Sequence, residues 1–139
     1  MVEPPAGSGT PQLRKLGIVP GARWSVIGAD PGWRFETAPD AAAEVPASAP
    51  ADVVLVFVRA AAEVEPALVE QEQRVFPAGA LWIAWPRKAA GHVSDLGDVV
   101  VRDAALARRL VDVKVAALDH DWSALRLVWR VEARGDARS

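Results

Sequence analysis

The chain has 139 residues, of which 51% are hydrophobic and 24% charged, and this composition is typical of one globular domain with a single core. Sixteen Lys and Arg residues against 18 Asp and Glu residues give a net charge of −2, which argues against nucleic-acid binding by bulk phosphate neutralisation. The absence of cysteine excludes disulfides, thiolate metal sites and a cysteine nucleophile. No signal peptide and no apolar run long enough to span a membrane is visible, so we expect a cytoplasmic protein without a membrane partner.

Both ends of the sequence lack residues that a core would bury. Residues 1–12 are rich in Pro and Gly and predict a flexible lead. Residues 132–139 are polar and predict a flexible tail. The sequence therefore predicts one folded domain over residues 13–131.

The first part of this domain contains one clear strand and one irregular segment. Gly17 and Pro20 favour a turn, and residues 23–28 (RWSVIG) predict a strand. The pattern of residues 34–51 is weak because three prolines interrupt it, so it predicts a helical turn at 41–44 and a short strand at 44–45 at most. Whether this segment is ordered is left open.

The middle of the chain alternates between strands and helices. Residues 52–58 (DVVLVFV) are continuously apolar and β-branched, which predicts a strand buried on both faces within a parallel sheet that has helices on each side. Residues 62–76 predict a helix with Pro66 in its first turn, and residues 80–85 predict a second buried strand. A further helix is expected from an N-cap at Asp98 to Leu110.

The last part of the domain changes to an alternating pattern that predicts a β-hairpin with its connection at 118–123. We expect one face to carry Val111, Val113, Val115 and Ala117, and the other strand to present Leu125, Leu127, Trp129 and Val131. The tryptophans on predicted strands, at 24, 82, 85 and 129, are expected in the core rather than in a base-stacking surface. Together the elements predict an α/β, Rossmann-like three-layer sandwich, whose mostly parallel sheet ends in a C-terminal antiparallel β-hairpin.

Several segments of the sequence also resemble a known family. Residues 16–21, 52–59, 79–88, 94–96 and 119–126 are similar to domain-of-unknown-function family 3052, small bacterial proteins common in actinobacteria, and this resemblance covers residues 12–130. The order of elements resembles a truncated class I S-adenosylmethionine-dependent methyltransferase. Such enzymes bind their cofactor with a glycine-rich loop after the first strand, whereas Pro31 and Trp33 occupy that loop here. We therefore expect no cofactor, and S-adenosylmethionine is disfavoured.

Polar residues follow the predicted strands at the edge of the sheet where open α/β sheets bind ligands. The residues expected to form this site are Arg59, Arg87, Lys88, Ser94, Asp95, Asp121, Trp122 and Ser123, with Asp30 and Trp33 nearby. Cations beside an indole suit an anionic or planar aromatic ligand. The alternative is an ordinary solvated rim in which Asp121 bonds the turn amides and Trp122 covers the core.

No catalytic or metal site is predicted. The sequence has neither a GxSxG elbow nor a GxxxxGK[ST] phosphate loop, and the adjacent residues Asp119, His120 and Asp121 alternate in direction on an extended chain. The sequence therefore favours a non-catalytic binding or interaction module with a protein partner. The alternative is a small enzyme or sensor that binds an anionic or nucleotide-like metabolite through Arg59, Lys88 and Asp121. Either a monomer or a homodimer is expected, because exposed strand edges are able to pair two copies.

Overall fold

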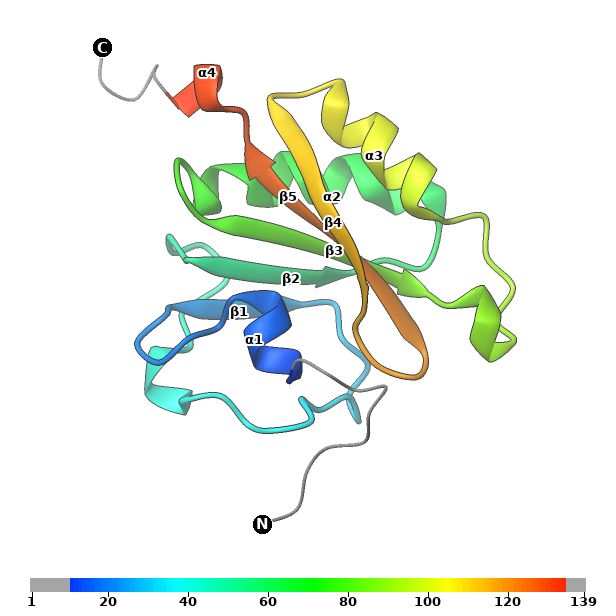
Figure 1. The fold of residues 1–139 in the computed structure, drawn as a ribbon, viewed down its shortest axis with the longest axis horizontal. Coiled ribbons are helices and arrows are strands. Elements are labelled where there is room, and N and C mark those ends of the chain that lie inside the picture. Colours follow the sequence, from blue (N-terminus) through cyan, green and yellow to red (C-terminus); the bar gives the residue numbers. More distant parts are fainter. Residues whose placement is uncertain (1–10, 135–139) are drawn as a thin grey trace.

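The computed structural model describes residues 11–134, which form one five-stranded sheet with helices against it (Figure 1). The strands are β1 (Trp24–Ile27), β2 (Val53–Phe57), β3 (Ala80–Pro86), β4 (Leu110–Ala117) and β5 (Trp122–Trp129). The α-helices are α1 (Gln12–Leu16), α2 (Val64–Gln71), α3 (Asp98–Leu106) and α4 (Val131–Arg134). The 3-10 helices are η1 (Ala41–Ala43), η2 (Ala61–Glu63), η3 (Glu72–Val75) and η4 (Lys88–Ala90).

Most of the predicted elements exist, and some boundaries differ. The helix expected over 62–76 is divided into η2, α2 and η3, and Pro66 lies in the first turn of α2. The helix expected to reach Leu110 ends at Leu106, because Leu110 is already a fully buried residue of β4. Of the predicted lead and tail, residues 1–10 and 135–139 lie outside the described residues. None of the helices within residues 11–134 is long and apolar enough to cross a membrane.

The sheet is mixed, so the predicted mostly parallel Rossmann-like sheet is wrong. Its strand order is β1-β2-β3-β5-β4. β1 pairs with β2 over four residue pairs and β2 with β3 over five, both in parallel. β5 pairs antiparallel with β3 over six residue pairs and with β4 over seven, so antiparallel pairing predominates. The prediction failed because β5 turns back and inserts between β3 and β4, which separates β4 from the parallel strands.

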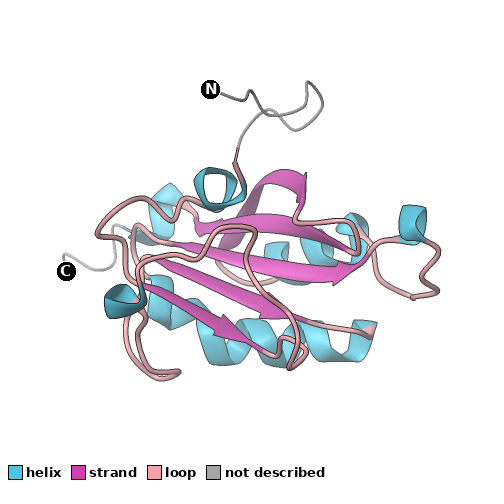
Figure 2. Cartoon of the chain, turned by 90° about the horizontal axis from the view of Figure 1, so that it is seen from below, coloured by secondary structure: helices cyan, strands magenta, loops and turns pink. Residues whose placement is uncertain are grey.

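The helices are also distributed unevenly, so the predicted three-layer sandwich is wrong as well. α2 and α3 cover one face of the sheet, as Figure 2 shows from below. Among the described residues, the other face is covered by the five-residue α1 and by the irregular segment 28–51. The prolines of that segment prevent the crossover helix that a Rossmann-like unit places between its first two strands.

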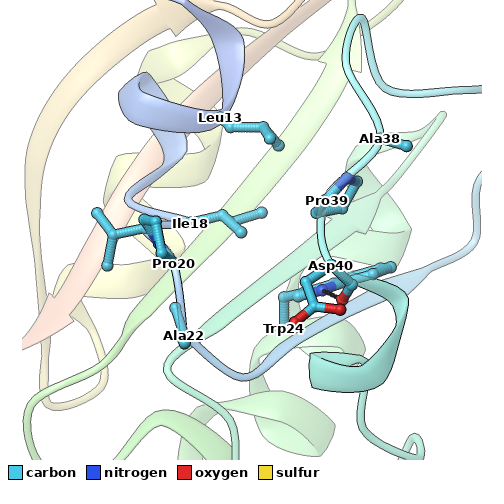
Figure 3. Close-up of a pocket in the computed structure, with 10 residues that line it drawn as sticks. Leu13, Ile18, Pro20, Ala22, Trp24, Ala38, Pro39 and Asp40 are labelled. Atoms are coloured by element: carbon cyan, nitrogen blue, oxygen red, sulfur yellow. Dashed lines mark hydrogen bonds between the residues drawn. The ribbon is translucent and has the colours of Figure 1, made fainter.

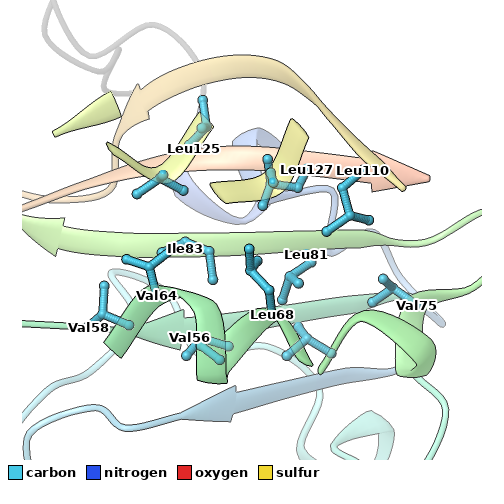
Figure 4. Close-up of a cluster of buried hydrophobic side chains, with 14 of the residues drawn as sticks. Val56, Val58, Val64, Leu68, Val75, Leu81, Ile83, Leu110, Leu125 and Leu127 are labelled. Carbon is cyan, nitrogen blue, oxygen red and sulfur yellow. The ribbon is translucent and has the colours of Figure 1, made fainter. Parts of the chain in front are cut away.

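The face under the helices holds the larger of two apolar clusters (Figure 4). Val56 of β2 and Leu81 of β3 point toward Leu68 of α2, and Leu125 of β5 belongs to the same cluster. All five residues of β2 are buried, as the continuous apolar run predicted. This strand is buried on both faces because its alternate residues pack into different clusters.

The second cluster is built around aromatic side chains. The fully buried Trp82 of β3 donates a hydrogen bond from Nε1 to the Leu16 carbonyl over 3.0 Å, which fixes α1 on the sheet. Trp33 and Phe35 approach edge to face, with ring centroids 4.9 Å apart, and Phe35 packs on Trp24 in the same way. The expectation that the four strand tryptophans lie in the core is confirmed, since each is less than 8% exposed.

A β-bulge changes the faces of the C-terminal hairpin. The register shifts between Asp112 and Lys114, so Val113 is an extra residue in β4. Val111 pairs with Val128 and Val115 pairs with Leu125, which place these two valines on opposite faces of the sheet. The prediction that the alternate residues from 111 to 117 share one face is therefore wrong. Val131, which was expected in the strand, begins α4 and is 74% exposed.

Gly79, the residue before β3, packs closely against the backbone just before β2. An added Cβ at Gly79 would lie 2.8 Å from the Asp52 carbonyl oxygen and 3.1 Å from that of Ala51. We expect Gly79→Ala to lower the free energy of unfolding by about 1–3 kcal/mol in urea titrations, because the backbone of β2 must move. Gly32→Ala is the matched control, since nothing lies within 4 Å of its added Cβ. Equal stability of the two variants would contradict this packing.

Candidate functional site

The predicted site residues come from loops that meet at one end of the sheet. The parallel strands β1, β2 and β3 end there, and pairing of Pro86 with Trp122 places the connection between β4 and β5 beside the end of β3. We call this end the rim, made of the loops 28–33, 58–60, 87–97 and 118–121. The topology therefore gathers the predicted residues, and the contacts that they make decide what they are able to bind.

Arg59 is held by neighbours within the rim. Its guanidinium forms an ion pair with Asp30 and lies over the Trp122 ring, 5.4 Å from the ring centroid. Its amide donates to Oε1 of Glu63 over 2.7 Å. The side chains of Arg59 and Asp30 are 42% and 60% exposed, so water screens this pair. An incoming anion would have to compete with Asp30 for the guanidinium.

Arg87 is also engaged, whereas Lys88 is not. Nη1 of Arg87 donates to the carbonyls of Asp119 and His120 over 3.3 and 2.9 Å. This side chain fastens the β4–β5 connection to the end of β3. Lys88 begins η4, is exposed, and makes no side-chain hydrogen bond or ion pair with any residue that the structure describes. Of the three predicted cations, Lys88 is the one available to a ligand.

The remaining predicted residues stabilise the local backbone. Oγ of Ser94 accepts from the Leu96 amide over 3.1 Å, and Oδ1 of Asp95 accepts from the Ala61 amide over 2.9 Å. Ser123 lies within β5 and pairs with Trp85 on one side and Ala117 on the other. Ser94 thus stabilises its own loop, Asp95 joins that loop to η2, and Ser123 is part of the sheet.

Asp119 organises the hairpin connection, although the sequence analysis did not place it in the binding site. Its Oδ1 accepts from the amides of Asp121 and Trp122, both over 2.9 Å, and its Oδ2 accepts from Nε1 of Trp33 over 2.8 Å. The prediction that Asp121 bonds the turn amides is wrong, because Oδ1 of Asp121 instead lies 3.0 Å from Nε2 of His92. Aspartate carboxylates commonly accept from the amide two residues later in a turn, but in this connection Asp119 makes that bond and not Asp121. Trp122 is 8% exposed and covers Phe57, as the alternative interpretation expected.

Two cavities lie at the opposite end of the sheet, where β1, β2 and β3 begin. They have volumes of about 260 and 400 Å³ and share residues 19–22 as a wall. Figure 3 shows the smaller one, with Leu13 and Ile18 facing Pro39 across an apolar space. Nε1 of Trp24 donates to the Asp40 carbonyl over 3.0 Å and holds the far wall in place.

The larger cavity has a different polar lining. Asp52 and Arg126 contribute charged side chains to a wall that is otherwise apolar side chains and backbone, including Leu16 and Val53. Hydrogen bonds from the side chain and amide of Arg23 lower the pKa of Asp52, which keeps this carboxylate ionised and paired. Sequence reasoning missed both cavities, although Gly and Pro at positions 17–21 already indicated an irregular loop there.

One edge of the sheet is partly open. β4 is the last strand in the order, so the groups on its outer side have no neighbouring strand. The Leu118 amide donates to the Trp122 carbonyl, which shows that Leu118, Ala116 and Lys114 direct their backbone groups toward β5. The backbone groups of Val115 and Ala117 therefore point outward, and Val115 is 49% exposed.

The other half of this edge is closed. Nε of Arg130 donates to the Leu110 carbonyl over 3.3 Å, and Nη2 donates to the Leu106 carbonyl over 2.9 Å. Asp112 forms an ion pair with Arg102, whose guanidinium lowers the pKa of Asp112. The bulge at Val113 then interrupts the strand, which is a common protection against edge pairing. We call the segment Lys114–Ala117 the open half of β4.

Comparison with known protein families finds no family that matches this chain, and no curated protein matches it. The resemblance to family 3052 therefore stays a prediction.

The two aspartates of the hairpin connection provide a test of its geometry. We expect Asp119→Ala to lower the free energy of unfolding by about 2–4 kcal/mol, because three hydrogen bonds to a carboxylate are lost. Asp121→Ala should cost less than about 1 kcal/mol, since its contact with His92 is exposed. Urea unfolding followed by tryptophan fluorescence measures both, and a larger effect at Asp121 would refute the assignment.

Proposed function

We propose that this chain is a non-catalytic interaction module, and that a second copy of the chain pairs with the open half of β4. One observation carries the proposal. Val115 and Ala117 are exposed apolar residues whose backbone groups face outward, on a strand whose other half is capped by Arg130. The proposal is for a cytoplasmic protein, which is the location that the composition favours.

The open half is self-complementary in an antiparallel register. With the two-fold axis at Ala116, Val115 of each copy faces Ala117 of the other, and each of these pairs exchanges two main-chain hydrogen bonds. Lys114 then faces Leu118 of the other copy, so no like charges oppose each other across the new ladder. An unrelated strand would need the same register and a complementary apolar pair to do as well.

The expected dimer is weak because the paired segment is short. Main-chain hydrogen bonds contribute about 0.5–1.5 kcal/mol each, and association itself costs at least about 4 kcal/mol. A dissociation constant of about 100 μM follows if burial of the four facing side chains adds a few kcal/mol. Such an interaction suits an assembly that forms and separates with local concentration.

The rim offers less support for the alternative function, a sensor or enzyme for an anionic metabolite. Arg59 is paired with Asp30, and Arg87 is bonded to two carbonyls of the hairpin connection. Lys88 is left as the available cation of the predicted set, and one exposed lysine provides little selectivity. We therefore prefer the interaction at β4.

Sedimentation equilibrium over about 10 μM to 1 mM tests the proposal. The chain should shift from monomer to dimer across this range, and Val115→Pro should stay monomeric. Proline removes an amide that points away from β5, so the β4–β5 ladder of the variant stays intact. Circular dichroism checks that the variant is folded.

Val115→Lys is a second test of the dimer, and Val99→Lys is its matched control. Both valines are about half exposed, at 57% and 49%, and Val99 lies on α3 rather than on the edge. Lysine at position 115 should abolish the dimer, whereas lysine at position 99 should leave it unchanged. A chain that is monomeric at 1 mM would overturn the proposal, as would a dimer that survives both changes at position 115.

A further inference from the structure

Two cations face each other on the sheet face that carries α1. Arg126 of β5 pairs with Lys114 of β4 on one side and with Trp82 of β3 on the other. Residues directly opposite each other on adjacent strands point to the same face with Cβ atoms about 5 Å apart. Nζ of Lys114 lies 6.0 Å from the Trp82 ring centroid, which confirms that its side chain is on this face. The two cationic side chains therefore leave adjacent positions on one face of the sheet, and Lys114 lies over the indole of Trp82.

No carboxylate neutralises this pair within residues 11–134. Neither Lys114 nor Arg126 forms an ion pair or a side-chain hydrogen bond there. The nearest acidic group along β4, Asp112, pairs with Arg102 of α3 on the other face. Asp52 shares the larger cavity with Arg126 but is bound to Arg23. Like charges directly opposite each other destabilise a sheet, so this arrangement costs stability without a ligand.

A third cation belongs to the same face. Gln12 and Leu16 of α1 are buried against the sheet, and Leu13 points into the smaller cavity on the β1 side (Figure 3). Lys15 follows Leu13 by about 200° around the helix, which places it on the flank toward β5 and β4. It is half-buried and has no side-chain partner among the described residues. We call Lys15, Lys114 and Arg126 the cationic cluster.

We propose that the cationic cluster binds the carboxylate or phosphate group of a small organic anion. The larger cavity extends from Arg126 along Leu16 and Val53 and has a volume of about 400 Å³, within the range of ligand sites. The charged group of the ligand lies between Lys114 and Arg126, and its apolar body lies in the cavity. This site is at the opposite end of the sheet from the rim, and it does not depend on pairing of β4 with a second copy.

NMR titration of the ¹⁵N-labelled chain with pyrophosphate, and separately with citrate, tests the site and distinguishes phosphate from carboxylate ligands. The indole Nε1–H of Trp82 reports directly, because it donates to the Leu16 carbonyl while Lys114 lies over the same ring. Saturable shifts are expected at this indole and at the amides of Leu16, Lys114 and Arg126. The variant Val115→Pro should give the same shifts, which separates this result from the fate of the proposed dimer.

Removal of either charge, at Lys114 or at Arg126, is a second test of the anion site. Lys114→Gln and Arg126→Gln should each abolish the saturable shifts and, without ligand, raise the melting temperature by about 2–4 °C, because the repulsion is relieved. Arg14→Gln is the control, since Arg14 is an exposed cation of α1 that lies on neither flank described above. Shifts that are unchanged in Arg126→Gln, or no saturable shift with either anion, would overturn the site. Loss of ligand-free stability in both glutamine variants would also contradict it.

Discussion

Burial of β2 and β3 on both faces is the constraint on which the rest of this structure depends. Every residue of β2 is buried, so each side of the sheet needs its own cover. Two helices supply one cover. The other is assembled from α1 and an irregular segment that brings Trp33 and Phe35 onto the sheet, and Trp82 fixes α1 there through the Leu16 carbonyl. The chain thus uses its aromatic residues where a crossover helix is missing.

This way of covering the sheet determines what is left exposed. Asp119, Arg87 and the pair of Arg59 with Asp30 connect the loops of the rim. These side chains are already bonded within the protein and are therefore less available to a ligand. α3 packs on β4 and its Arg102 holds Asp112, but the open half of β4, including Lys114, stays accessible. The two proposals, pairing at β4 and anion binding at the cationic cluster, both arise from this uncovered part of the sheet.

The sequence predicted the elements better than their arrangement. Continuous β-branched residues identified β2, and alternation identified the hairpin, because both signals are local. The place of β5 between β3 and β4 depends on long-range pairing that no local pattern records. The bulge at Val113 moved Val115 to the other face, since one extra residue inverts a period of two. The predicted rim residues do lie near one another. Their availability to a ligand depends on contacts between distant segments, such as Arg59 with Asp30 and Trp33 with Asp119, which no local pattern records.

Hydrogen exchange at single amides of β4 tests the central claim, that this strand is open on its outer side in its last half. In dilute solution, we expect rapid exchange at Val115 and Ala117 and strong protection at Ala116, whose amide points toward β5. The protection of Val115 and Ala117 should rise with protein concentration. Equal protection of all three amides in dilute solution would show that another part of the chain covers this edge, and it would contradict the account.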